Sequence, residues 1–122
     1  MADPTLVQGA RPQPFGTPHV LALAVVDGLD LHAIHRIAAA ETTVGRGVEA
    51  DFALSDPSVS KRHVVILVDG TVYTLIDLES LNGTFLNDRR VSAGGRERLK
   101  PLDEIRIGDS RILFTASRFR VG

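Results

Sequence analysis

Short apolar runs separated by turn dipeptides constrain the fold of this chain more than any other feature of its sequence. The runs are too short for helices, and the only stretch of helical composition, residues 38–41, is too short to count as one. Closely spaced turns between short strands are typical of a β-sandwich or barrel. We therefore predict an all-β fold of many short strands. The turn signals are Asp27-Gly28, Asp69-Gly70, Asn82-Gly83, Gly94-Gly95 and Gly108-Asp109.

The apolar runs place the expected strands along the chain. Val64–Val68 is apolar at nearly every position, which suits a strand in the middle of a sandwich sheet. Residues 47–58 read as a loop, with Asp56-Pro57 marking a turn. The expected strands cover residues 19–26, 31–39, 42–44, 63–68, 71–78, 85–86, 91, 104–107 and 111–115.

Length and composition fit one globular domain with short ends. Of the 122 residues, we assign 1–18 to a flexible arm that contains Pro and Gly, 19–118 to the folded domain and 119–122 to a tail. The absence of Cys excludes disulfides and thiolate zinc sites. A net charge of −1 argues against a nucleic-acid binder. No run reaches the ~20 apolar residues of a membrane span, so a cytoplasmic location is expected.

Polar side chains follow three of the apolar runs, where loops should lie at strand ends. They are Arg46, Ser60-Lys61-Arg62-His63 and Asn82-Gly83-Thr84. A guanidinium can offer two parallel N–H donors to an oxyanion, and a carboxamide can donate and accept along a peptide backbone. These groups suit the binding of a dianion on a peptide better than they suit catalysis. Each motif also has a plainer interpretation. Arg46 can pair with Glu49 or Asp51, the Ser60 hydroxyl can stabilise its own turn beside the solvated charges of Lys61 and Arg62, and Asn82-Gly83 can make a simple hairpin.

These motifs and their neighbours resemble the signature of the forkhead-associated (FHA) domain. The resemblance covers most of the chain from about Val20 to Thr115. It implies an all-β sandwich of two mainly antiparallel sheets, with about 10–11 short strands, that binds phosphothreonine peptides and has no catalytic activity. The matching blocks are Gly45-Arg46, Asp51, Leu54, Asp56, Val59 to His63, Asp77 to Asn87 and Leu102 to Gly108.

The resemblance also implies roles for individual residues. It assigns phosphopeptide contacts to Arg46, Ser60, Lys61, Leu81 and Asn82. Lys61 is preferred to Arg62, because adjacent residues point to opposite faces and the family places the residue after the Ser nearest the phosphate. The residues expected to support the loops are Gly45, His63, Gly83 and Thr84.

Three positions depart from the family pattern. Leu81 stands where Thr or Ser is common, so one polar contact to the ligand is lost, and an apolar contact to the threonine methyl group can take its place. Glu79 and Leu102 stand where Gly is frequent, and the charge of Glu79 is unfavourable near a phosphate. These departures keep open an alternative, in which a degenerate FHA fold serves as a phospho-independent structural or docking domain.

The expected partner is a phosphothreonine-containing protein or peptide, either a substrate of a Ser/Thr kinase or the kinase itself. We expect a monomer without cofactor, metal, nucleic acid or membrane. A Ser60–His63 catalytic pair is rejected because no third group or oxyanion loop accompanies it. Phosphorylation of Thr5 or Thr17 would open a further alternative, in which the arm docks into a neighbouring copy. The basic segments 89–90 and 96–100 are interpreted as a solvated rim.

Overall fold

The computed structural model describes residues 19–118, and these form eleven strands. The expected arm (1–18) and tail (119–122) lie outside the described residues. Within residues 19–118, no helix is long and apolar enough to cross a membrane. In chain order the strands are β1 (His19–Asp27), β2 (Ile34–Ile37), β3 (Glu41–Gly45), β4 (Phe52–Ala53), β5 (Val64–Asp69), β6 (Val72–Asp77), β7 (Thr84–Leu86), β8 (Arg89–Val91), β9 (Arg96–Leu99), β10 (Glu104–Ile107) and β11 (Ser110–Arg118).

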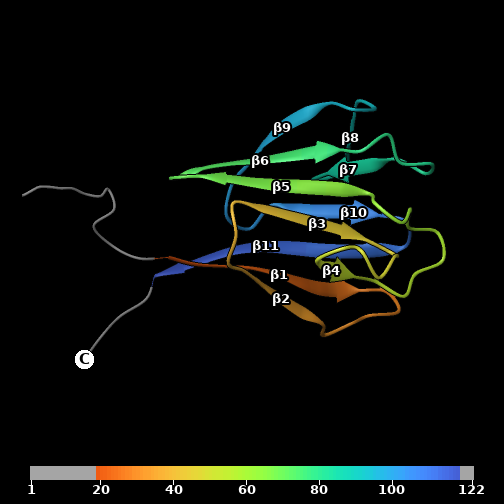
Figure 1. The fold of residues 1–122 in the computed structure, drawn as a ribbon, viewed down its shortest axis with the longest axis horizontal. Coiled ribbons are helices and arrows are strands. Elements are labelled where there is room, and N and C mark those ends of the chain that lie inside the picture. The colour runs from red at the N-terminus through yellow and green to blue at the C-terminus, as the bar shows by residue number, and fades with distance from the viewer. Residues whose placement is uncertain (1–18, 119–122) are drawn as a thin grey trace, which may run out of the picture.

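The strands form two sheets that face each other (Figure 1). The larger sheet has the order β2-β1-β11-β10-β7-β8, and the smaller has the order β4-β3-β5-β6-β9. The described pairings are antiparallel except for β3 with β4, which is parallel. The predicted all-β sandwich of two mainly antiparallel sheets is confirmed.

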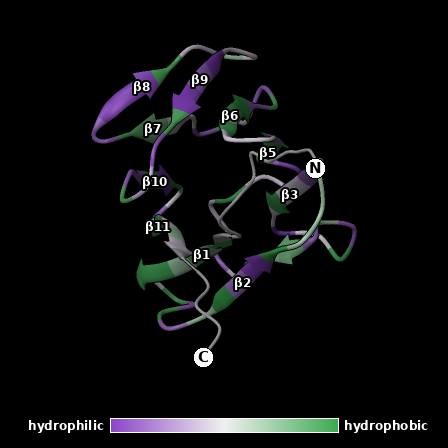
Figure 2. Ribbon diagram, turned by 90° about the vertical axis from the view of Figure 1, so that its left-hand side faces the viewer, coloured by the Kyte–Doolittle hydropathy of each residue, from purple (hydrophilic) through white to green (hydrophobic). Residues whose placement is uncertain are grey.

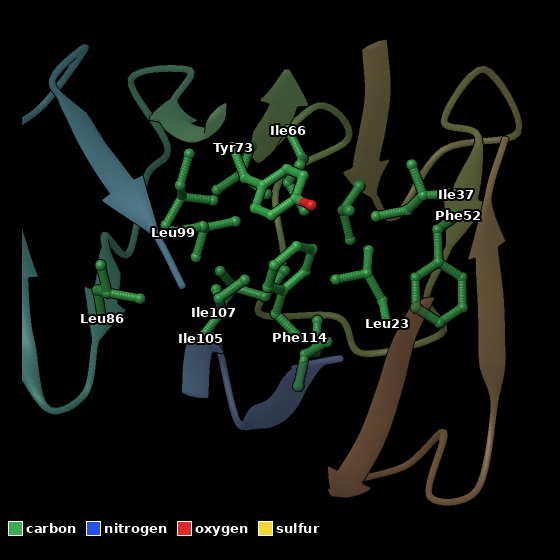
Figure 3. Close-up of a cluster of buried hydrophobic side chains, with 14 of the residues drawn as sticks. Leu23, Ile37, Phe52, Ile66, Tyr73, Leu86, Leu99, Ile105, Ile107 and Phe114 are labelled. Atoms are coloured by element: carbon green, nitrogen blue, oxygen red, sulfur yellow. The ribbon is translucent and has the colours of Figure 1, made fainter. Parts of the chain in front are cut away.

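A single apolar core fills the space between the sheets (Figure 3). Alternate residues of each strand supply it, as the two-residue repeat of a strand requires. On β1, for example, Leu21, Leu23 and Val25 are buried. Tyr73 from the smaller sheet meets Phe114 from the larger one edge-to-face, with 5.3 Å between ring centroids. This aromatic contact joins the two layers near the middle of the core.

One expected strand and one expected loop differ from the observed structure. The return strand expected over residues 31–39 is limited to β2, because the chain first makes consecutive turns, with hydrogen bonds from Leu31 N to Gly28 O and from Ala33 N to Asp30 O. Residues 47–58, expected to be a loop, contain the two-residue strand β4. A two-residue strand is too short for the alternation of apolar and polar residues to be recognised in the sequence.

The basic segments interpreted as a solvated rim are strands β8 and β9. Both are largely hydrophilic (purple in Figure 2), which concealed β9 entirely and limited the strand expected at β8 to Val91. Each nevertheless places one apolar side chain in the core, Val91 and Leu99, at 2% exposure in both cases. Each of these edge strands has only one buried apolar residue, so the charged residues around it conceal the alternation of a strand.

Three loops gather at one end of the sandwich. Strands β3 and β6 end there, and β5 begins there, as the arrows in Figure 1 show. The three motifs that the sequence singled out lie on these loops: Arg46 after β3, residues 60–63 before β5, and residues 82–83 after β6. The antiparallel order of β3, β5 and β6 in one sheet is what brings them together.

Candidate functional site

Backbone hydrogen bonds attach the loop after β3 to the loop before β5. Arg46 N donates to Ser60 O at 3.0 Å, and Gly47 N donates to Lys61 O at 3.4 Å. A Cβ atom at Gly45 would overlap the carbonyl oxygen of Lys61. Only glycine therefore allows the two loop segments to lie so close, and this is why Gly45 precedes Arg46.

The Arg46 side chain is held at its Nε and leaves its outer amino groups for a ligand. Nε donates to Val59 O at 3.0 Å. Among the described residues, neither Glu49 nor Asp51 forms an ion pair with it. Asp51 instead accepts a hydrogen bond from Thr43 N at 2.9 Å. The structure thus gives the guanidinium a fixed position without neutralising its charge.

Lys61 and Arg62 line different hollows of the surface. Lys61 borders a hollow of about 410 Å³ together with Arg46, Gly47, Val48 and Glu49. Arg62 borders a separate hollow of about 410 Å³, which Leu78, Glu79 and Gly94 also line. The structure therefore brings Lys61, and not Arg62, beside Arg46.

The Ser60 hydroxyl connects two loops. Its Oγ accepts a hydrogen bond from Leu81 N at 3.0 Å. Accepting this bond leaves the hydroxyl proton available for donation to an anion. The Leu81 side chain contributes nothing to the bond and stands 86% exposed at the rim.

Asn82 is held against the loop before β5 by its carboxamide. Its Nδ2 donates to Ser58 O at 2.8 Å. A carboxamide has two N–H donors and an acceptor oxygen, so one N–H and Oδ1 remain for a ligand backbone. The structure therefore brings Arg46, Ser60, Lys61, Leu81 and Asn82 to one rim.

His63 supports these loops from inside the protein. It is fully buried; Nδ1 accepts from Ser60 N at 3.0 Å, and Nε2 contacts Gly83 O at 2.8 Å. An acceptor Nδ1 means that Nε2 carries the proton and donates to Gly83 O. Burial lowers the pKa of His63 below its ordinary value of 6.5, although the hydrogen bond to Gly83 O and the charges of Asp77 and Asp56 oppose this. His63 is therefore a neutral brace with both ring nitrogens engaged.

Asp77 shapes the loop after β6, a role that the sequence analysis missed. Its buried carboxylate accepts hydrogen bonds from Ser80 Oγ at 2.5 Å, Thr84 Oγ1 at 2.6 Å and Gly94 N at 3.3 Å. Burial alone would raise the pKa of Asp77, but these hydrogen bonds lower it below its ordinary value. Thr84 is thereby placed as a supporting residue, and Gly83 adopts φ +86°, which favours glycine.

Asp56 is a second buried carboxylate, which the sequence analysis named only as part of a turn and of the family pattern. It is 2% exposed and accepts from Ser58 N and Oγ, from Asp109 N at 2.9 Å and from Ser110 Oγ at 2.9 Å. Burial raises the pKa of Asp56, and the hydrogen bonds outweigh it, so the pKa lies below its ordinary value. Asp-x-Ser is the signal of a local Asx turn, and it could have marked Asp56 as a structural group.

The geometry does not assemble a catalytic pair from Ser60 and His63. Nδ1 of His63 accepts the backbone N–H of Ser60 rather than its hydroxyl, and Nε2 is occupied by Gly83 O. A general base must reach the proton that it removes. Among residues 19–118, no group of three His, Asp or Glu side chains is placed to hold a metal ion.

Comparisons with known proteins agree with this fold. The FHA domain-containing protein FhaA of Mycobacterium tuberculosis is 44% identical over 70 residues, which cover 57% of this chain and 13% of FhaA. The oxoglutarate dehydrogenase inhibitor of Corynebacterium glutamicum is 37% identical over 75 residues, 62% of this chain and 50% of that protein. The chain thus spans half or less of the length of these two relatives.

A solved structure and a family profile complete the comparison. The structure comes from work on phosphothreonine-dependent FHA domain interactions; it has a TM-score of 0.71 and 35% identity, over 79% of this chain and 95% of that one. The profile of the FHA domain matches residues 42–108, more than half of the chain. The chain therefore belongs to the FHA domain family.

Proposed function

We propose that this protein is a phosphothreonine-dependent peptide-binding module that mediates protein–protein interaction in Ser/Thr kinase signalling. One observation carries the proposal: donors from three loops, far apart in sequence, converge on one rim and hold one another by direct hydrogen bonds. A phosphothreonine carries about −1.5 to −2 charges at pH 7 and three acceptor oxygens. It needs such a convergent set of donors.

Each rim residue has a distinct role in this proposal. The outer amino groups of Arg46 bind the phosphate oxygens, with Lys61 adding a second positive charge and the Ser60 hydroxyl a neutral donor. Arg46 contributes most, since a hydrogen bond to a charged group is worth about 1.5–3 kcal/mol against about 1 kcal/mol for a neutral one. Asn82 binds the peptide backbone, and the exposed Leu81 contacts the threonine methyl group.

The relatives support the chemical class of the ligand. The FHA domain that matches at 35% identity takes part in phosphothreonine-dependent interactions. By the same reasoning we propose a partner that is a Ser/Thr-kinase substrate or the kinase itself, bound without catalysis by a monomeric module in the cytoplasm. The engagement of both His63 nitrogens with backbone groups supports binding without catalysis.

Calorimetry with a phosphothreonine peptide library tests the proposal. The wild-type chain is expected to bind the phosphorylated library and to bind the unphosphorylated one at least tenfold more weakly. Arg46→Ala should cost about tenfold or more, because a charge-assisted contact is lost. Arg62→Ala is the matched control; its side chain lines the other hollow, so affinity should stay within about twofold.

The same measurement separates the proposal from the phospho-independent docking domain that Leu81 and Glu79 suggest. Equal affinity for phosphorylated and unphosphorylated peptides would overturn phosphothreonine dependence. Partner binding that survives Arg46→Ala would instead favour an interface on a face away from the three loops.

A further inference from the structure

A row of arginine and aromatic side chains crosses the outer face of the larger sheet. The register places Phe85 on β7 directly opposite Arg90 on β8 and Arg106 on β10. The neighbours of Phe85 along β7, Thr84 and Leu86, are buried. Since successive strand residues point to opposite faces, Phe85 and its two partners point outward.

Both guanidinium groups lie around the Phe85 ring. The Cζ atom of Arg106 is 4.0 Å from the ring centroid, and that of Arg90 is 5.7 Å from it. Both distances are within the range of a cation–π contact. The ring therefore holds two like charges close together on one surface.

Neither charge is neutralised within residues 19–118. The neighbouring arginines are paired: Arg111 with Glu104 at 2.6 Å and with Asp88 at 3.6 Å, and Arg89 with Glu97 at 3.6 Å. No described carboxylate forms an ion pair with Arg90 or Arg106. The Nε atom of Arg106 is buried and has no hydrogen-bond partner among the described residues. Buried donors are normally satisfied, so this group lacks an acceptor.

The row begins directly behind the ligand rim. A Cβ atom at Gly83 would lie 2.9 Å from a terminal nitrogen of Arg90, so the Arg90 guanidinium covers the backbone next to Asn82. From there the row continues across neighbouring strands, over Phe85 to Arg106. A peptide bound at Asn82 can reach it within a few residues, because an extended chain advances about 3.3 Å per residue.

We propose that Arg90, Phe85 and Arg106 form a second site for the same ligand, which binds acidic residues outside the phosphothreonine motif. Planar guanidinium groups bind carboxylates through paired hydrogen bonds, and the flat aromatic ring between them excludes water from one side of each. The inference rests on the proposed function, since it assigns the acidic segment to the phosphorylated partner. It gives the module a preference for partners in which Asp or Glu lies several residues from the phosphothreonine.

Calorimetry with tailed peptides tests the second site on the full chain. The probes are phosphothreonine libraries that carry four Glu residues, or four Gln residues, beginning four positions before or after the phosphothreonine. At low ionic strength, one Glu tail is expected to improve affinity roughly three- to fivefold over its Gln counterpart, the range for exposed charge pairs. The gain should shrink as salt is raised.

Two variants decide whether the row is responsible. Arg90→Gln with Arg106→Gln should abolish the gain and leave affinity for Gln-tailed peptides within about twofold. Arg90 is exposed, so Arg90→Gln alone is expected to fold even if the double variant does not, and it should reduce the gain. Arg89→Gln is the matched control and should retain the gain, because Arg89 points away and pairs with Glu97. No gain from either tail, or a gain that survives the loss of both arginines, overturns the second site.

A separate titration distinguishes failure of the second site from failure of the proposed function. In an NMR titration, an unphosphorylated hexaglutamate peptide is expected to shift the ring resonances of Phe85 in both wild type and Arg46→Ala. Absence of that shift refutes the second site even where phosphopeptides bind. Absence of phosphopeptide binding, with the shift present, refutes phosphothreonine dependence alone.

Discussion

Replacing His63 with alanine is expected to lower the free energy of unfolding by about 3 kcal/mol. The substitution leaves the half-buried Ser60 N–H without its acceptor and the buried Gly83 C=O without its donor. Each such group that loses its partner costs about 1–3 kcal/mol, so the two together cost about 2–6 kcal/mol. Water entering the space left by the ring keeps the loss in the lower half of this summed range. For a domain of this size, the melting temperature should fall by roughly 12–20 °C.

Urea denaturation of the wild type and of His63→Ala measures the difference in their free energies of unfolding. The two values are comparable if the m-value is unchanged. His35→Ala serves as the control, since His35 is half-buried on an edge strand and stacks on Phe52 at 5.2 Å; a loss below about 1 kcal/mol is expected. Below its melting temperature, His63→Ala should also bind phosphopeptide more weakly, because the loops that carry Ser60 and Asn82 lose their shared support. A stability within about 0.5 kcal/mol of wild type would refute the bracing role of His63.

Three further results are expected. Because the folded-state pKa of His63 is lowered, the unfolded chain binds the proton more readily, so thermal stability should fall as pH drops below 6.5, and His63→Gln should remove this dependence. Asp56→Ala should destabilise by about 2–4 kcal/mol in urea titrations, because Ser110 Oγ and Asp109 N lose their acceptor. Leu102→Gly should raise stability by about 0.5–1 kcal/mol, because Leu102 has φ +75° and an exposed side chain, whereas Leu102→Ala keeps the strained backbone and should be neutral.

The sheets were predictable from sequence because most strands carry an unambiguous pattern. The hairpin of β5 and β6 follows from a continuous apolar run, Asp69-Gly70 and a second run. Strand β9 was missed because only Leu99 among its four residues is buried, so charge dominated its appearance. The start of β2 was misplaced because Leu31 is apolar but lies in a turn, where local hydrogen bonds decide the conformation.

The rim residues were predictable by type, but their mutual support was not. A guanidinium, a hydroxyl and a carboxamide at strand ends can be recognised one by one. The bond from Leu81 N to Ser60 Oγ joins residues 21 positions apart, and the contact of Ser110 with Asp56 joins residues 54 apart. Such pairings depend on how the loops fold over one another, which no local pattern encodes. For Glu79 a sequence pattern does have a local structural cause. Its φ is +56°, a conformation that favours glycine, and glycine is the residue that the family pattern frequently has at this position.

At position 81 the main chain and the side chain do different things: the backbone N–H of Leu81 binds Ser60, and the side chain is exposed. The main chain of residue 81 holds the serine hydroxyl in place, while its side chain extends into solvent and touches nothing in the scaffold that the bond requires. Any amino acid with an N–H group can therefore occupy position 81 without loosening the loops. A substitution at position 81 is therefore expected to change contacts to the proposed ligand and to leave the proposed phosphate-binding groups in place.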